Sequence, residues 1–128
     1  MTRFEDLGNG IIRDTRTGLE WQAEPFGPAT WPKQMDAASK LNLGGHTDWR
    51  LPTIEELVTL IDFSRCNPAS KFPGQRPEWF WSSSSRVAYT SYAWRVDFNV
   101  GYVDNDGKAY GGHARCVRAA LAGKEAPE

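Results

Sequence analysis

A run of serines is the first feature of this sequence that could perform chemistry. Ser82–Ser85 follows Trp81 directly, and serine hydroxyls act as nucleophiles in many hydrolases when a neighbouring base activates them. The Gly-x-Ser-x-Gly turn that often presents such a nucleophile does not surround these residues. Small hydroxyl side chains beside a tryptophan in a strand are more typical of packing, so we predict that the run is not catalytic.

Histidines and acidic residues offer two candidate metal sites, and both are incomplete. His46 and Asp48 form a His-x-Asp pair and His113 stands alone, so the third ligand of a zinc site is missing at a suitable spacing. Asp104–Gly107 resembles the start of a calcium loop, but His113 occupies the position of that loop's bidentate glutamate. We therefore predict neither a metal nor another cofactor.

Cys66 and Cys116 are the only cysteines and leave two alternatives open. They could form one disulfide, or both could be reduced and mostly buried, which is the simpler interpretation, because pairing cannot be read from sequence. The first residues, Met1–Asp6, lack the charged and apolar regions of a signal peptide. The sequence is thus compatible with a cytoplasmic protein or with a domain cut from a surface or secreted protein.

Length and charge exclude several classes of protein. A chain of 128 residues suits one domain, which we place at 1–122, followed by a flexible polar tail at 123–128. With 15 Lys and Arg against 16 Asp and Glu, the chain lacks the positive field that attracts nucleic acid. No apolar run approaches the roughly 20 residues of a membrane span.

The first half of the chain predicts short strands followed by two helices. Residues 3–24 alternate between apolar and polar side chains around two turn sequences, a pattern typical of a strand meander. Thr30 precedes a helix whose apolar residues recur every three or four positions from Trp31. The capping box Thr53-Ile54-Glu55-Glu56 and the apolar face behind it predict a second helix over 53–63.

The remainder predicts a proline-containing surface loop over 64–78 and then strands. Period-two alternation indicates strands at 79–83 and 94–98. We expect Asp106-Gly107 to turn a hairpin and 114–119 to supply the last strand.

Six tryptophans predict a core built from large rings, because each buried ring removes ~150–250 Å² from water. Trp21, Trp49, Trp81 and Trp94 are expected to be buried together in one core. Arg50 follows Trp49, where a cation would be largely buried and paired with a carboxylate of the second helix.

Several short segments together resemble a known family, the C-terminal domain of the Legionella collagen-like adhesin and its bacterial relatives. The matching segments, within residues 4–119, are Thr17-Gly18-Leu19-Glu20-Trp21, Thr30-Trp31, Asp48-Trp49-Arg50-Leu51-Pro52-Thr53, Trp81-Ser82-Ser83-Ser84, Ala93-Trp94-Arg95-Val96-Asp97-Phe98 and Arg115-Cys116-Val117-Arg118. The resemblance implies an α+β, C-type lectin-like fold, with two helices flanking a small twisted antiparallel sheet and with long loops. It also implies adhesion or recognition rather than catalysis. Relatives often have a cysteine in the first helix, where this chain reads Met35-Asp36-Ala37-Ala38-Ser39.

The segment Asn99–His113 is the best candidate for binding. It is rich in Tyr, Asn, Asp and Gly, which build adaptable recognition surfaces and suit a solvated hairpin equally well. The predicted ligand-binding residues are Arg95, Asn99, Tyr102, Asp104, Asn105, Asp106, Lys108, Tyr110 and His113. Some relatives resemble the variable proteins of diversity-generating retroelements, and most of these positions fit that pattern.

Three hypotheses follow. The leading one is a non-enzymatic domain that presents residues 95–113 to a protein or glycan ligand. The second is a structural knob of a larger surface adhesin, which would form a homo-oligomer. The third is an enzyme related to the formylglycine-generating group, which needs reactive cysteines or a copper site that the spacing of Cys66 and Cys116 does not suggest.

Overall fold

The N-terminal residues form the strand meander that their alternation predicts. In the computed structural model, which describes residues 2–119, β1 (Phe4–Asp6), β2 (Ile11–Asp14) and β3 (Glu20–Gln22) pair in antiparallel fashion. The turn between β1 and β2 has positive φ at Asn9 (58°), a conformation that asparagine tolerates better than most residues. β9 (Val117–Arg118) adds to β3, so this small sheet has the order β1-β2-β3-β9.

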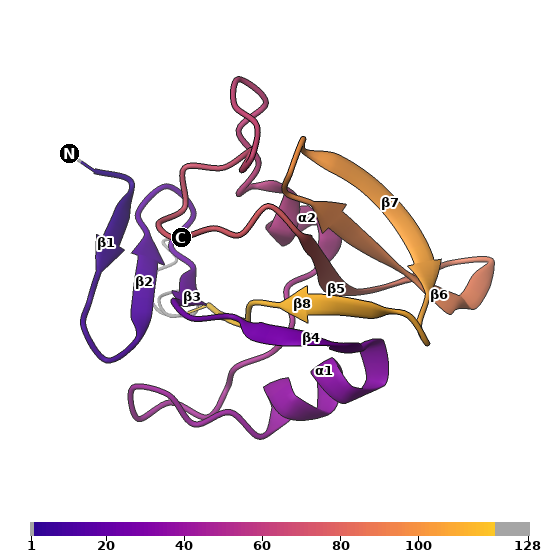
Figure 1. Ribbon diagram of the computed structural model, residues 1–128. Coiled ribbons are helices and arrows are strands. Elements are labelled where there is room, and N and C mark those ends of the chain that lie inside the picture. Colours follow the sequence, from indigo (N-terminus) through magenta and orange to yellow (C-terminus); the bar gives the residue numbers. More distant parts are fainter. Residues whose placement is uncertain (1, 120–128) are drawn as a thin grey trace.

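A second, larger sheet contains the remaining strands in the order β4-β8-β5-β6-β7. Its strands are β4 (Phe26–Thr30), β5 (Trp79–Arg86), β6 (Tyr89–Asp97), β7 (Tyr102–Gly107) and β8 (Gly111–Ala114). All neighbours are antiparallel except β5 and β8, which are parallel. The predicted α+β class is confirmed, although the strands form two sheets, one of them mixed, where we expected one small antiparallel sheet. Figure 1 shows the β1–β3 meander at one end of the molecule and the β6–β7 hairpin at the other.

Helix α1 (Trp31–Ser39) begins directly after Thr30, as predicted. It lies along β4 and β8 (Figure 1) and turns Gln34 and Ala38 inward. The Gln34 amide donates hydrogen bonds to the carbonyls of Gly27 and Gly112, both at 2.8 Å. The face that α1 buries is therefore fastened by a polar side chain as well as by apolar packing.

Helix α2 (Ile54–Val58) has the predicted capping box but is shorter than predicted. The Thr53 hydroxyl accepts from the Glu56 amide, and the Glu56 carboxylate accepts from the Thr53 amide. Beyond Val58, i to i+3 hydrogen bonds tighten the chain and bring Leu60 into the core.

Arg50 pairs with Glu56 of α2, as expected for a cation at this position, with 2.7 Å between Nη1 and Oε1. Its predicted burial is wrong, because the side chain is 43% exposed. The partner carboxylate lies at the solvent-facing start of α2, so the pair forms at the surface.

The predicted hairpin at Asp106-Gly107 is wrong. β7 pairs with β6, through the turn at 98–101, and not with β8, which lies between β4 and β5. The chain therefore crosses from one edge of the large sheet to its interior after Gly107. The predicted last strand is also interrupted, because Arg115 and Cys116 separate β8 from β9 and carry the chain into the small sheet.

The core consists of two clusters, which correct the prediction of one. Trp21 packs with Leu57, Phe80 and Val96 in the first cluster, whereas Trp49 and Trp81 belong to the second. These three tryptophans are at most 3% exposed, but Trp94 is half-buried and belongs to neither cluster.

The segment 64–78 is a loop, as predicted, but part of it enters the core. Phe72 is buried against Phe4 and Trp21. The Arg115 guanidinium stacks 4.2 Å from the Phe72 ring centre, and it donates to the carbonyls of Gln22 and Ala23. Burial lowers the pKa of Arg115 to about 10. One buried cation thus joins the small sheet to this loop. The predicted tail at 123–128 lies outside the described residues.

Core burial predicts different losses of stability at two tryptophans. Trp49→Ala is expected to lower the free energy of unfolding by ~3–5 kcal/mol, because it leaves a cavity in a buried cluster. Trp94→Ala is expected to lower it by about 1–2 kcal/mol, since its ring is half-buried. Urea denaturation of both variants checks this, and equal losses would contradict the assignment.

The Arg3–Asp14 pair predicts a loss of stability in acid. Burial by itself raises the pKa of Asp14, but hydrogen bonds from Arg3 and from the Arg16 amide outweigh it and hold the pKa below its ordinary value. The ionised carboxylate therefore stabilises the fold above the unfolded value of about 3.9. This contribution is lost as the pH falls through that value toward the folded pKa.

We accordingly expect the stability difference between the parent and Asp14→Asn to shrink between pH 6 and pH 3, followed by urea denaturation at each pH. Asp36→Asn is the matched control, because the Asp36–Lys40 pair is exposed, with side chains 63% and 74% accessible. If the difference in free energy of unfolding between the parent and Asp14→Asn does not vary with pH, the charge of the Asp14 carboxylate does not stabilise the fold.

Candidate functional site

Strands β5, β6 and β7 bring several predicted residues to one face of the large sheet. In register, Trp79 lies opposite Asp97, which lies opposite Tyr102, and Arg95 lies opposite Asp104. Residues paired across strands share a face, and the next residue along each strand points the other way. We call the set on this side the outer face. It contains Trp79, Arg95, Asp97, Tyr102, Asp104 and Asp106.

Arg95 is the centre of the outer face and is mostly enclosed. Its guanidinium lies 4.1 Å from the Trp79 ring centre and 5.6 Å from that of Trp81. Its Nη2 donates to Asp106 at 2.7 Å, and the side chain is 13% exposed. The cation is held by ring stacking and by an ion pair, so it orients its neighbours more than it offers a free charge.

Tyr102 is presented on this support. The Trp79 and Tyr102 rings meet edge to face, with centres 6.3 Å apart, while Tyr102 remains 57% exposed. Asp104 is exposed beside it. Sequence reasoning missed Trp79, although the alternation in Trp79-Phe80-Trp81 could have placed it on the face opposite Phe80.

Tyr110 and Lys108 follow β7 directly. Tyr110 is 63% exposed and packs over Gly107, where an added Cβ would lie 3.4 Å from ring carbons. Lys108 places its ammonium 4.0 Å from the Trp31 ring centre and donates to the Ser85 hydroxyl at 2.8 Å. Tyr110 is thus available to a ligand, whereas the Lys108 charge is already engaged.

Three predicted site residues lie away from the outer face. Asn105 points to the opposite side and its amide oxygen accepts from Arg86 at 3.4 Å. His113 stacks on Phe80 of the first core cluster, with ring centres 5.3 Å apart, and burial is the main cause of its lowered pKa. Asn99 is exposed in the β6–β7 turn. The structure therefore splits a segment that is continuous in sequence.

The serine run supports the fold. Ser82 donates to the Trp94 carbonyl at 2.7 Å, and the Ser84 hydroxyl accepts from the Ile54 amide at the start of α2. Ser83 donates to the Pro52 carbonyl at 3.2 Å. These hydroxyls hold β5 to β6 and to α2, as the packing interpretation predicts.

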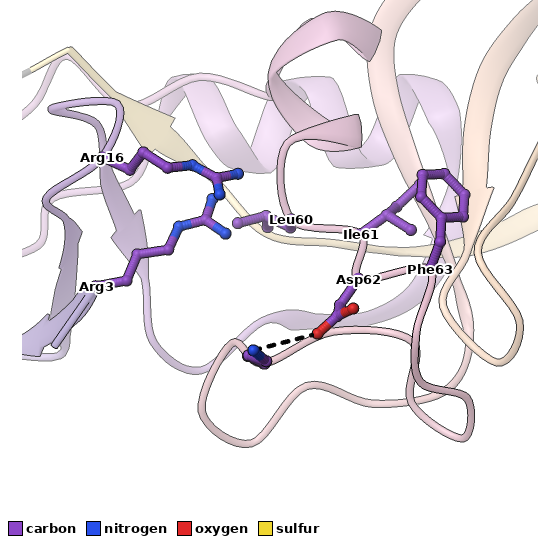
Figure 2. A pocket seen from close by; sticks show the side chains of 7 residues that line it. Arg3, Arg16, Leu60, Ile61, Asp62 and Phe63 are labelled. Atoms are coloured by element: carbon purple, nitrogen blue, oxygen red, sulfur yellow. Dashed lines mark ion pairs between the residues drawn. The ribbon is translucent and has the colours of Figure 1, made fainter.

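A cleft of about 340 Å³ lies between the β1–β3 meander and the segment after α2; Figure 2 shows the side chains that line it. Arg3 and Arg16 extend into it side by side and point toward Leu60. Two of its cations are already matched by carboxylates, because Arg3 pairs with Asp14 and Lys71 lies 3.7 Å from Asp62. None of the predicted binding residues lines this cleft.

The two cysteines are free thiols in different environments. Cys66 is exposed in the loop before β5, whereas Cys116 is buried between β8 and β9. Burial raises the pKa of Cys116 to about 12, so its thiol stays protonated and unreactive. Of the two alternatives that the sequence left open, the structure has the free thiols, and the burial expected with them holds only for Cys116.

Within residues 2–119, no three His, Cys, Asp or Glu side chains are grouped in a way that could hold a metal ion. Over the same residues, no helix is both long and apolar enough to span a membrane.

The chain belongs to the Lcl C-terminal domain family, whose sequence pattern matches residues 10–118. This confirms the resemblance found in the sequence. A search of curated proteins finds no match to the chain.

The thiol environments predict selective modification. In the folded protein, an aromatic disulfide reagent is expected to react within minutes with Cys66 only, because Cys116 is buried and its pKa is raised. Reaction of both thiols is expected in denaturant. Rapid reaction of both thiols in the folded state, with Cys66→Ser as the control that isolates Cys116, would contradict the described burial.

Proposed function

We propose that this domain is a non-enzymatic recognition module that binds a protein or glycan ligand through the outer face, with the exposed Tyr110 that follows β7 as a further contact. The observation that carries the proposal is the exposed Tyr102, which is supported by Trp79 and, through it, by Arg95.

The physical argument rests on preorganisation. A ligand that covers an exposed tyrosine gains a large contact area at a low cost in side-chain entropy. The Arg95–Asp106 pair and the Trp79 ring hold the surface around Tyr102 in place before binding. Asp104 adds an exposed carboxylate that can select polar groups, so the face combines an aromatic anchor with a polar neighbour.

Family membership supports an adhesin-associated role, and we extend the proposal to a C-type lectin-like scaffold. A role as the variable protein of a diversity-generating retroelement is compatible with the contacts. Replacing Tyr102, Asp104 or Tyr110 would change the surface without entering either core cluster. Asp106 and His113 make internal contacts, so they suit such variation less well.

The absence of catalysis is part of the same proposal. Two observations support the absence of catalysis. The hydroxyls of Ser82 and Ser84 form hydrogen bonds with backbone groups, and the Cys116 thiol is buried. These contacts favour a structural role for the serine hydroxyls and for Cys116.

A structural, oligomerising role is the second candidate. Exposed apolar side chains favour it, since Val87 is 94%, Phe63 75% and Val100 56% exposed. Phe63 lies against Gly101, next to Val100, whereas Val87 lies in the turn at the other end of β6. Exposed apolar groups can mark contacts between proteins.

The proposal predicts that binding and stability respond separately to changes at the outer face. The double variant Tyr102→Ser with Tyr110→Ser is expected to keep the parental melting temperature within about 2 °C, because both rings are largely exposed. Affinity for a ligand selected with the parent domain on glycan and cell-surface protein arrays should fall at least about tenfold, by surface plasmon resonance.

Tyr92→Ser is the matched control, because Tyr92 is 40% exposed and alternation places it on the opposite side of β6. This variant should bind as the parent does. Undiminished affinity in the double variant would place the binding surface elsewhere, and an equal loss in the control would point to a general effect of removing tyrosine.

A further inference from the structure

β7 is an edge strand of the large sheet, with β6 on one side only (Figure 1). In an antiparallel ladder, alternate residues direct both backbone groups toward the partner strand and the others direct them outward. Directly after β7, the Lys108 amide donates to the Ser91 carbonyl on the β6 side at 2.9 Å. Counting back in steps of two, the amides of Asp106, Asp104 and Tyr102 also point toward β6. The amides of the residues between them, Val103, Asn105 and Gly107, therefore point away from β6.

Two of these outward amides are occupied by the strand's own side chains. The Asn105 amide donates to Asp104 Oδ1 at 2.8 Å, and the Gly107 amide donates to Asp106 Oδ1 at 2.8 Å. Within the described part of the chain, Val103 is the outward amide of β7 without such a carboxylate. Asp106 makes this bond with one oxygen while the other accepts from Arg95.

An unprotected edge strand invites pairing with another strand, and proteins prevent this with charges, bulges or covering segments. β7 has six residues, a length sufficient for a ladder, and it includes Tyr102 and Val103, whose side-chain types favour strands. The strand is therefore competent to pair, and its outward amides are the groups through which a second copy would bind.

We propose that Asp104 and Asp106 close the β7 edge by bonding its outward amides, and so prevent antiparallel pairing of β7 with the β7 of a second copy. The same carboxylates would face one another across such a pair, and like charges opposite each other destabilise a ladder. The inference concerns the edge of β7 and does not depend on which ligand the outer face binds.

Two double variants separate amide bonding from charge. Asp104→Ala with Asp106→Ala removes both the acceptor oxygens and the charges, whereas Asp104→Asn with Asp106→Asn removes the charges and keeps an oxygen at each position. Amide hydrogen exchange, resolved by residue with NMR, reports the two bonds directly, and the Val103 amide serves as the internal reference. Sedimentation velocity over a range of protein concentrations reports self-association relative to the parent.

In the alanine variant, we expect the Asn105 and Gly107 amides to exchange about tenfold faster, since a charged acceptor has been lost from each. Self-association should increase with protein concentration. In the asparagine variant, exchange and self-association should both rise less than in the alanine variant, because a neutral amide oxygen still accepts from each backbone amide.

The single variant Asp104→Ala keeps the Arg95–Asp106 ion pair, so it still tests the proposal if the double variant does not fold. It should accelerate exchange at Asn105 while leaving Gly107 unchanged. Unchanged exchange at Asn105 in this variant would overturn the bonding. Equal self-association of the alanine and asparagine doubles would show that charge alone protects the edge, and faster exchange without new self-association would overturn the protective role.

Discussion

Burial of β5 on both of its faces is the constraint on which the rest of the structure depends. Phe80 and Trp81 are neighbours in sequence and both are at most 1% exposed, so each face of the large sheet must be covered. Phe80 packs into the first core cluster with Val96 and Phe98, and Trp81 into the second with Trp49. Gly112 of β8 allows this packing, because an added Cβ there would lie 2.8 Å from the Trp81 Nε1. The position of β8 beside β5 and the position of α1 over it follow from that close approach.

The outer face begins where the second cluster ends. Trp79 lies two residues before Trp81 and therefore on the same side of β5, but it is only half-buried. Arg95 bridges the two rings, so the buried part of the sheet holds the exposed part in place. A surface built in this way can present Tyr102 firmly without giving it a place in the core.

Ion pairs hold β9 in the small sheet in a similar manner. Glu20 accepts from Arg13 and Arg118, each at 2.8 Å, and Arg118 also donates to Asp48 at 2.6 Å. Although burial raises the pKa of Glu20, these partners hold it below its ordinary value. The last described strand is thus fixed to β3 and to the segment before α2. Arg115 fixes the loop before β5 by a different means, through carbonyls and an aromatic ring.

Local signals in the sequence determined much of this architecture. Short segments predicted the strands of 3–24, the start of α1 after Thr30, the capping box of α2, the pairing of Arg50 with a carboxylate of that helix and the family. Each of the structural features depends on few neighbouring residues. Strand partners depend on distant residues instead. Only the tertiary structure decided that β7 and β8 lie apart, that Trp94 is excluded from both clusters and that Phe72 enters the core. The candidate site shows the same division. Composition identified Tyr102, Asp104 and Tyr110, whereas only the tertiary structure placed Trp79 on the outer face and turned Asn105 and His113 away from it. The reason is that the direction of a side chain in a sheet is set by register with strands that are remote in sequence.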